Sequence, residues 1–164
     1  MAKILIISAT SGNNLVLGNK LQSFLTELGV ESDLVNLEEI SLPLYTPSAD
    51  GPCDRINTLA NKFSSASGFL FCAPEYNGSV PPVLSNAITW ISVKSKNWRD
   101  VFNGKFAVIG THSGGDGYGF LTAFRSQLEY MGTNVLARTI SITKEKPLNE
   151  DSVKRILQGL VDLV

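Results

Sequence analysis

The stretch that decides the fold is residues 68–82, with the sequence GFLFCAPEYNGSVPP. Its first part, Gly68 to Cys72, is a continuous apolar run, which is typical of a parallel strand covered on both faces. The polar segment from Ala73 to Pro82 holds three prolines, each fixing φ at about −65°. A helix is expected to begin near Pro82. Small ligands bind at the carboxyl edge of open α/β sheets, so this stiff segment is predicted to position one.

The same alternation of apolar strands and amphipathic helices extends over the whole chain. Because strands alternate with helices, we expect βαβ units and a parallel sheet. Five strands joined by right-handed crossovers favour a three-layer, flavodoxin-like α/β fold of order 2-1-3-4-5, with helices on both faces. The expected strands are 4–7, 31–37, 68–72, 105–110 and 135–142; the expected helices are 15–28, 55–64, 82–93, 120–131 and 150–163, with a long loop at 38–52.

Length and composition narrow the class of protein. The chain has 164 residues, which suits a single domain over 1–164, and 43% of them are hydrophobic. A net charge of −1 without a basic stripe gives no support for nucleic-acid binding. No apolar run reaches the length of a membrane span, and no signal-peptide pattern follows Met1. Cys53 and Cys72 are far apart, so we expect reduced thiols and a cytoplasmic location.

Three polar loops are predicted to share one edge of the sheet, because they follow central strands. The first loop is Ser8-Ala9-Thr10-Ser11-Gly12-Asn13-Asn14, in which five of seven residues carry a hydroxyl or an amide. Backbone N–H groups at the start of a helix can bind a phosphate there. N-capping of the helix explains the same residue types, so both interpretations remain open.

The second loop is the proline-containing segment, Ala73 to Pro82. An ordinary strand-to-helix connection would explain the prolines near the helix start. Tyr76, however, is a large aromatic residue in a loop, where such residues more often bind ligands than pack. We expect Glu75 to act as a structural hydrogen-bonding group rather than as an acid or base.

The third loop, Gly110 to Gly119, contains five glycines in ten residues, which lets the backbone approach a flat ligand closely. His112 is the only histidine of the chain. It either ends the strand or takes part in chemistry, and the sequence favours neither. Asp116 is expected to be a solvated or turn-forming residue.

The chain lacks the residues that three other kinds of function would need: a serine hydrolase, a zinc site and a response regulator. There is no Gly-x-Ser-x-Gly nucleophile elbow, so a serine hydrolase is excluded. One histidine and two dispersed cysteines give no zinc-ligand set, and no metal site is expected. A response regulator would need acidic residues after the first and third strands, where this chain has Ser8 and Cys72.

The chain resembles the NAD(P)H-dependent FMN reductases of flavodoxin-like fold, which include quinone, chromate and azo reductases. The resemblance is strongest over Pro74-Glu75-Tyr76-Asn77-Gly78-Ser79-Val80-Pro81, continuing through Leu84, Asn86-Ala87-Ile88 and Trp90. Leu42-Pro43-Leu44-Tyr45 and Ser113-Gly114-Gly115 match further family loops. The first loop differs, since relatives carry Ser-x-Arg there and this chain has no arginine in it. Its Ser11-Gly12-Asn13-Asn14 is closer to the Thr-Gly-Asn-Thr of flavodoxins, and Thr89 stands where many relatives have aspartate.

The resemblance implies FMN as cofactor and NAD(P)H as reductant. It implies that the phosphate binds the first loop, that the ring lies between the second and third loops, and that Tyr76 shapes the substrate face. Relatives place that face at a subunit interface, so a homodimer or homotetramer is expected. No side chain is expected to act as acid or base. The implied cofactor-binding residues are Ser8, Thr10, Ser11, Gly12, Asn13, Asn14, Pro74, Glu75, Tyr76, Asn77, Gly78, His112, Ser113, Gly114, Gly115 and Gly117.

The main functional hypothesis is an oxidoreductase that passes two electrons from NAD(P)H to a quinone-like or other small acceptor, or to free flavin. The alternative is a flavodoxin-type carrier of single electrons without its own NAD(P)H activity. The first loop favours the carrier, whereas the second loop and the near-neutral charge favour the reductase. A sheet that has lost its flavin and serves as a binding module is a third possibility.

Overall fold

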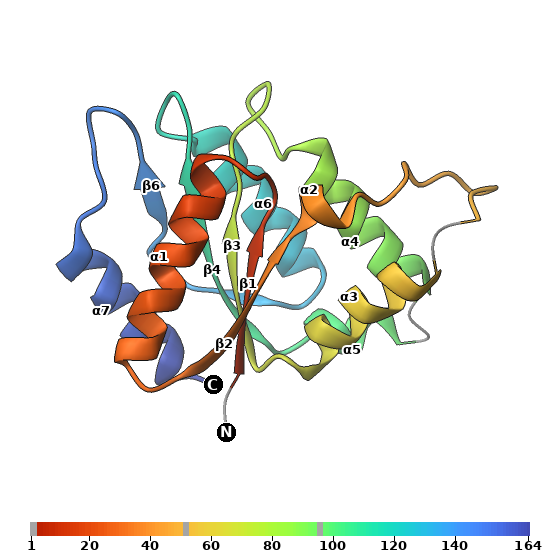
Figure 1. Ribbon diagram of the computed structural model, residues 1–164, viewed down its shortest axis with the longest axis horizontal. Helices are drawn as coiled ribbons and strands as arrows, with labels where there is room; N and C mark the ends of the chain where they lie inside the picture. Colours follow the sequence, from red (N-terminus) through yellow and green to blue (C-terminus); the bar gives the residue numbers. More distant parts are fainter. Residues whose placement is uncertain (1–2, 51–52, 95–96) are drawn as a thin grey trace.

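A parallel β-sheet forms the middle layer of the computed structural model, which describes residues 3–50, 53–94 and 97–164 (Figure 1). Its strands run in the order β2-β1-β3-β4-β5, with β6 also paired in parallel to β4. The predicted order 2-1-3-4-5 is therefore confirmed. The strands are β1 (Lys3–Ser8), β2 (Glu31–Asn36), β3 (Gly68–Cys72), β4 (Phe106–His112), β5 (Asn134–Val135) and β6 (Ile140–Ile142).

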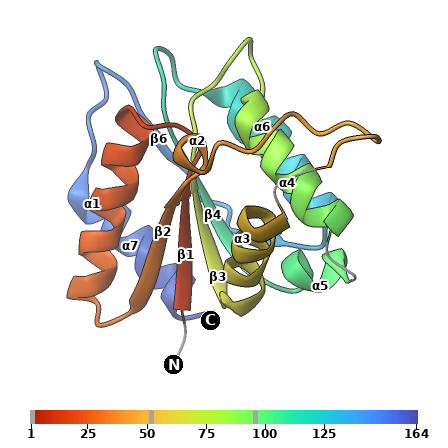
Figure 2. The same cartoon turned by 45° about the vertical axis from the view of Figure 1, so that its right-hand side comes forward.

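Helices cover both faces of the sheet, as Figures 1 and 2 show from two directions. One face is covered by α1 (Asn13–Glu27) and α7 (Glu150–Val161). The other is covered by α3 (Cys53–Ser65), α4 (Pro82–Lys94), α5 (Trp98–Phe102) and α6 (Tyr118–Tyr130). The short α2 (Leu37–Ile40) follows β2. The three-layer flavodoxin-like arrangement is thus confirmed, and no helix in the described part of the chain is long and apolar enough to cross a membrane.

The core divides into two halves because successive strand residues point to opposite faces. Ile4 and Ile6 of β1 pack on the α1 and α7 side, whereas Leu5 and Ile7 pack on the side of α3, α4 and α6. All four are at most 1% exposed, so each contributes about 1.5–3 kcal/mol of hydrophobic burial. This burial on both faces is why the sequence of β1 is continuously apolar.

The predicted fifth strand, 135–142, was wrong as one continuous strand. The structure has two short strands instead, β5 and β6, which pair with opposite ends of β4. Between them the chain leaves the ladder, and Arg125 of α6 takes over as donor. Its Nη1 donates to the Val135 carbonyl at 3.0 Å and its Nη2 to the Leu136 carbonyl at 2.7 Å. The break therefore coincides with these hydrogen bonds from α6, the helix that precedes β5.

Several predicted boundaries also needed correction. The expected loop at 38–52 overlaps α2, which is capped by the Asn36 side chain accepting the Glu38 N–H at 3.2 Å. The five-residue helix α5 was not predicted. The first helix begins two residues earlier than expected, at Asn13 rather than Leu15. The fourth strand extends to His112 rather than Gly110, because Thr111 and His112 pair with β6.

Candidate functional site

The loops that follow β1, β3 and β4 lie together at the carboxyl edge of the sheet, at the top of Figure 1. The hydrogen-bond ladder continues into them. The Ala9 N–H donates to the Cys72 carbonyl at 2.9 Å, and the Ala73 N–H donates to the Gly110 carbonyl at 3.2 Å. The structure therefore brings the first, second and third loops side by side at the point where the strand order reverses, as the sequence predicted.

The first loop exposes Ser11, Gly12 and Asn13 just before and at the start of α1. Gly12 is the N-cap residue and has no side chain with which to cap the helix. Ser8 is fully buried, and its Oγ donates to the Thr10 carbonyl at 2.7 Å. The hydroxyl of Ser8 thus shapes the loop. The backbone at the helix start is the part of this loop that a ligand could reach.

Asn14 belongs to the first loop but faces the third. It is 2% exposed, its Nδ2 donates to the His112 carbonyl at 3.0 Å, and its Oδ1 accepts the His112 N–H at 2.9 Å. This amide pair ties α1 to the end of β4. The side chain of Asn14 and the backbone of His112 are therefore occupied by each other, while the His112 side chain is half-buried.

Sequence reasoning missed two partners of the first loop, one at the end of β2 and one in α2, which follows it. The Ser11 N–H donates to Glu38 Oε2 at 2.6 Å, and Asn36 Nδ2 donates to Ser11 Oγ at 2.9 Å. The one signal in the sequence was their position, since polar residues directly after β2 must lie at the same edge as the first loop.

The middle of the second loop forms a tight turn. Tyr76 and Ser79 exchange backbone hydrogen bonds of 3.2 and 3.0 Å. The two residues between them, Asn77 and Gly78, have positive φ angles of 51° and 71°. Asn-Gly is the dipeptide that most favours positive φ at both central positions of such a turn. The two hydrogen bonds hold the turn in shape. Because its residues are exposed, its peptide groups are accessible.

Glu75 joins the second loop to the third. Its N–H donates to Ser113 Oγ at 2.8 Å, and its Oε2 accepts the Phe120 N–H at 3.0 Å. The Ser113 hydroxyl also lies 2.8 Å from Thr111 Oγ1. A carboxylate at the first turn of α6 is favourable, because the helix dipole is positive there. Glu75 is thus a structural hydrogen-bonding group, as expected.

The third loop is held from both sides. Asp116 Oδ1 accepts the Tyr118 N–H at 3.2 Å, and the Asp116 carbonyl accepts from Ser141 Oγ at 2.7 Å. This is the turn-forming role expected of Asp116. Gly117 then takes a left-handed conformation, with φ of 68°, at the N-cap of α6. Pro74, at the start of the second loop, is half-buried.

Four glycines of these loops expose open backbone. A Cβ atom added at Gly12, Gly78, Gly114 or Gly115 would meet nothing within 4 Å. Glycines in a core usually serve close packing, whereas these leave their Cα faces free. The three loops therefore present accessible peptide groups to one shared edge, which suits a flat ligand with a phosphate at one end.

Two exposed tyrosines flank these open glycines. Tyr76 is 48% exposed, as predicted for a loop residue, and Tyr118 is 72% exposed at the start of α6. Tyr118 was not among the predicted site residues. The sequence signal that could have indicated Tyr118 was its position directly after Asp116-Gly117. A bulky side chain between a turn and the start of a helix has little to pack against.

Cys72 lies at the end of β3, beneath the second loop. It is a free thiol, 1% exposed, and burial raises its pKa to about 12. The thiolate is the reactive form of cysteine, so Cys72 is inert at neutral pH and acts as a small core residue.

The tryptophan at the end of the family resemblance, Trp90, helps to hold the structure together. Trp90 Nε1 and Asn86 Nδ2, both on α4, donate to the Pro43 carbonyl at 2.7 and 2.9 Å. Asn86 Oδ1 also accepts the Tyr45 N–H at 2.8 Å, and the Tyr45 ring meets Trp90 edge-on at 5.0 Å. Two of the sequence matches, 42–45 and 86–90, thus bind each other.

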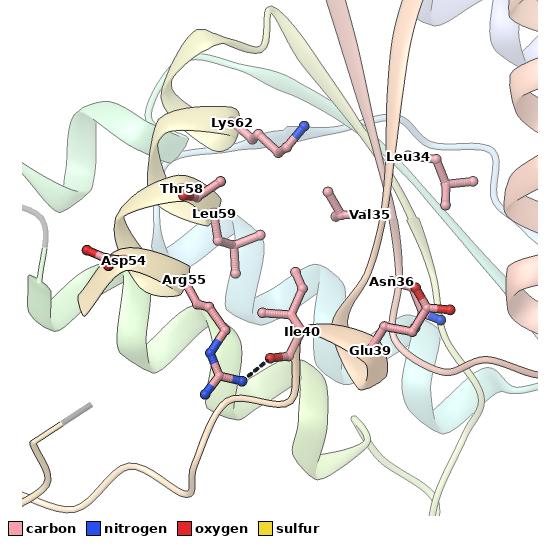
Figure 3. A pocket seen from close by; sticks show the side chains of 10 residues that line it. All are labelled: Leu34, Val35, Asn36, Glu39, Ile40, Asp54, Arg55, Thr58, Leu59 and Lys62. Carbon is pink, nitrogen blue, oxygen red and sulfur yellow. Dashed lines mark hydrogen bonds between the residues drawn. The ribbon is translucent and has the colours of Figure 1, made fainter. Parts of the chain in front are cut away.

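A separate cavity of about 490 Å³ opens between β2, α2 and α3 (Figure 3). Arg55 lies beside it and donates through Nη1 to the carbonyls of Ile40 and Ser41 at 2.7 and 2.9 Å. The cavity contains none of the predicted site residues. It is lined by Leu34, Val35, Asn36, Glu39, Ile40, Asp54, Arg55, Thr58, Leu59 and Lys62.

A family model described as NADPH-dependent FMN reductase matches residues 2–146. The chain belongs to this family. It is 30% identical over 156 residues to a quinone reductase of Pseudomonas putida, covering 87% of this chain and 82% of that protein. It is also 38% identical over 79 residues to a 2-hydroxy-1,4-benzoquinone reductase of a Burkholderia species, covering 46% of this chain and 42% of that one.

This member of the family spans about half the length of several curated relatives: the matches cover 42%, 57% and 56% of three of them. Among solved structures, its fold is similar to that of FerB, a flavoenzyme NAD(P)H:(acceptor) oxidoreductase from Paracoccus denitrificans. That likeness has a TM-score of 0.79 at 20% identity and covers 99% of this chain and 97% of the other. At that identity the likeness supports the fold alone.

Proposed function

We propose that this family member is an FMN-dependent oxidoreductase that passes two electrons from NADH or NADPH to a quinone-like or other small acceptor, or to free flavin. The observation that carries the proposal is the shared edge at which Gly12, Gly78, Gly114 and Gly115 leave backbone open. FMN, when bound there, would supply the hydride-accepting and electron-transferring chemistry. The protein would supply binding, orientation and electrostatics.

The first loop would hold the phosphate. Backbone N–H groups of Gly12 and Asn13, at the start of α1, carry the partial positive charge of the helix dipole. Thr10 and Ser11 extend this edge on the side of β1. The side chains of Ser8 and Asn14 would act indirectly, because their hydrogen bonds to backbone keep the loop in shape.

The second and third loops would hold the ring. Peptide groups of Asn77 and Gly78 on one side, and of Gly114 and Gly115 on the other, are exposed, and the turn at Asn77-Gly78 is held by the two backbone hydrogen bonds between Tyr76 and Ser79. Glu75 fixes the spacing between the two loops through its bonds to Ser113 and Phe120. Tyr76 would border the acceptor.

The test is anaerobic reduction of the purified protein supplied with FMN. We expect flavin fluorescence to be quenched on binding, and the visible absorbance to bleach rapidly after NADH or NADPH is added. Bleaching with dithionite alone would indicate the single-electron carrier instead. Failure to bind FMN or riboflavin would contradict both and leave the flavin-free binding module.

The acceptor class is tested by steady-state oxidation of NADH and NADPH. The similarity to proteins named quinone reductase supports benzoquinones, so we expect faster turnover with a benzoquinone than with free FMN. Faster turnover with free FMN would assign the protein to flavin reduction instead. The ratio of rates with the two nucleotides gives the preferred reductant.

We also infer that two copies associate through the face formed by α4 and α6, as a homodimer or as half of a homotetramer. Val93 and Tyr130 are 50% and 75% exposed on these helices, beside a cavity of about 410 Å³. Exposed apolar patches of this kind often mark interfaces. Light scattering should give a dimer or tetramer for the wild type and for Val16→Asp, whose site lies on α1. Tyr130→Asp should give a species of half that mass, a monomer from a dimer or a dimer from a tetramer. A monomeric wild type would contradict the inference.

We propose that residues 1–164 form a single flavin-binding domain. We also propose that the protein is located in the cytoplasm. The buried free thiol of Cys72 supports a reducing compartment. Fractionation of cells that express a tagged chain tests the location. Recovery of the protein with membranes or outside the cell would contradict it.

A further inference from the structure

A carboxylate of the chain itself lies at the first loop. Glu38 Oε2 accepts the Ser11 N–H at 2.6 Å, immediately before the N-cap of α1. Asn36 Nδ2 adds a bond of 2.9 Å to the Ser11 hydroxyl. The loop that we propose for a phosphate thus already donates one of its N–H groups to an anion.

The position of Glu38 is set by its helix. The Asn36 side chain caps α2 by accepting the Glu38 N–H at 3.2 Å. At the other end, Arg55 donates to the carbonyls of Ile40 and Ser41, and Figure 3 shows its bond to Ile40. Because both ends of α2 are fixed, the carboxylate of Glu38 points toward Ser11.

The charge of Glu38 is not neutralised locally. Within residues 3–50, 53–94 and 97–164, no basic side chain forms an ion pair with it. The first loop has no arginine or lysine, and Lys20, the next basic residue along the chain, pairs with Glu150 at 2.8 Å. A phosphate monoester carries more than one negative charge at neutral pH. It would meet a like charge and a missing N–H donor at the same place.

We propose that Glu38 sets the specificity of the first loop: its carboxylate competes with the phosphate of FMN, so FMN is held loosely and exchanges, while riboflavin, which has no phosphate, is unaffected. This inference rests on the proposed function, because it assumes a flavin at this edge. The inference is narrower than the proposed function, because it concerns only how the phosphate group of FMN is bound.

The experiment compares dissociation constants of FMN and riboflavin, measured by quenching of flavin fluorescence on the purified flavin-free protein. Glu38→Gln removes the charge, and Glu38→Ala removes both the charge and the bond to Ser11. The matched control is Glu39→Gln, the next residue of α2, which loses the same charge but lines the separate cavity. Thermal melting of each variant shows whether it is folded.

We expect Glu38→Gln to tighten FMN binding by at least about fivefold, because a charge-assisted competitor is lost, and Glu38→Ala to tighten it at least as much. Riboflavin binding should change by less than about twofold in both variants, and Glu39→Gln should change either flavin by less than about twofold.

Weaker FMN binding in the folded Glu38 variants, or equal changes for FMN and riboflavin, would overturn the inference and leave the proposed function standing. Equal tightening by Glu39→Gln would also overturn it, because net charge rather than the contact with Ser11 would be responsible. If neither flavin binds the wild type or any variant, both the inference and the proposed function fail.

Discussion

Gly119 decides how closely the second and third loops approach. A Cβ atom at this position would collide with the backbone carbonyl of Gly78 and lie 2.9 Å from Glu75 Oε2. The carbonyl belongs to a rigid turn and cannot rotate away as a flexible side chain could. Because Glu75 also binds the first turn of α6, any shift of Gly78 would disturb both loops.

Gly119→Ala should therefore destabilise the protein by about 1–3 kcal/mol, the usual cost of overpacking, and weaken flavin binding. Urea unfolding followed by circular dichroism measures the first effect, and quenching of flavin fluorescence measures the second.

The control for this prediction is Gly159→Ala. Gly159 also lies in a helix, α7, but a Cβ atom there would make an ordinary contact at 4.0 Å with Leu136. The replacement should stabilise the protein by about 0.5–1 kcal/mol, because alanine favours helices. If both variants lost the same stability, the contact between Gly119 and Gly78 would not be the cause.

At the scale of elements, the long helices and the central strands could be predicted from sequence. The continuous apolar runs around Ile6 and Phe69 are the signature of buried parallel strands, and these strands are where they were expected. The helices α2 and α5 have four and five residues, too few to show helical periodicity, and were missed. At the break between β5 and β6, Arg125 donates to the Val135 carbonyl, a side-chain contact that the apolar pattern of 135–142 does not indicate.

The site divides in the same way. The glycine-rich and proline-rich loops were predictable, because parallel strands place their carboxyl ends at one edge. The hydrogen-bond partners of individual side chains within these loops were not predictable. That Asn14 faces His112, and that Glu38 faces Ser11, follows from the packing of α1 against β4 and from the position of α2. Sequence alone gives the residue types at the edge and not their partners.

The loop after α2 depends on α4 for its position. Asn86 makes two bonds to it, donating to the Pro43 carbonyl and accepting the Tyr45 N–H. Asn86→Ala should raise the hydrogen-exchange rate of the Tyr45 amide by at least about tenfold, since this amide would lose its acceptor. Asn19→Ala on the surface of α1 is the control and should leave that amide unchanged. Continued protection of Tyr45 in Asn86→Ala would contradict the anchoring role.

The edge strand β2 is stabilised by charge. Asp33 accepts from Lys62 and Lys3 at 3.0 and 3.1 Å, and these bonds, Lys62 first, hold its pKa below the ordinary value of 3.8. A lowered folded-state pKa means that the stabilisation is complete above 3.8 and is lost as the pH falls through the folded-state value.

Asp33→Asn should therefore reduce the free energy of unfolding near neutral pH by less than about 1 kcal/mol, since the pairs are partly exposed. Urea unfolding at decreasing pH should bring variant and wild type together once the pH falls below the lowered folded-state pKa of Asp33. A difference that does not change with pH would show that the ion pairs contribute nothing to stability.

In the whole molecule, the two edges of the sheet have different tasks. The carboxyl edge carries the loops of the candidate site, whereas the opposite edge carries turns joined by hydrogen bonds, such as that of the Gly104 N–H to the Gly132 carbonyl at 2.8 Å. Thr133 lies at that opposite edge, 3% exposed, and its Oγ1 donates to the Phe102 carbonyl at 3.1 Å. A change there should alter stability without altering binding.

Thr133→Val tests this separation. Valine keeps the shape of threonine but lacks the hydroxyl, so the Phe102 carbonyl loses one of its donors while the Lys105 N–H remains bound to it at 3.2 Å. The free energy of unfolding should fall by about 1 kcal/mol, the usual net value of one hydrogen bond. FMN and riboflavin affinities, measured well below the unfolding midpoint, should stay within about twofold of wild type. A larger loss of flavin affinity in the folded variant would show that the opposite edge positions the loops of the carboxyl edge, and that stability and binding are coupled through the sheet.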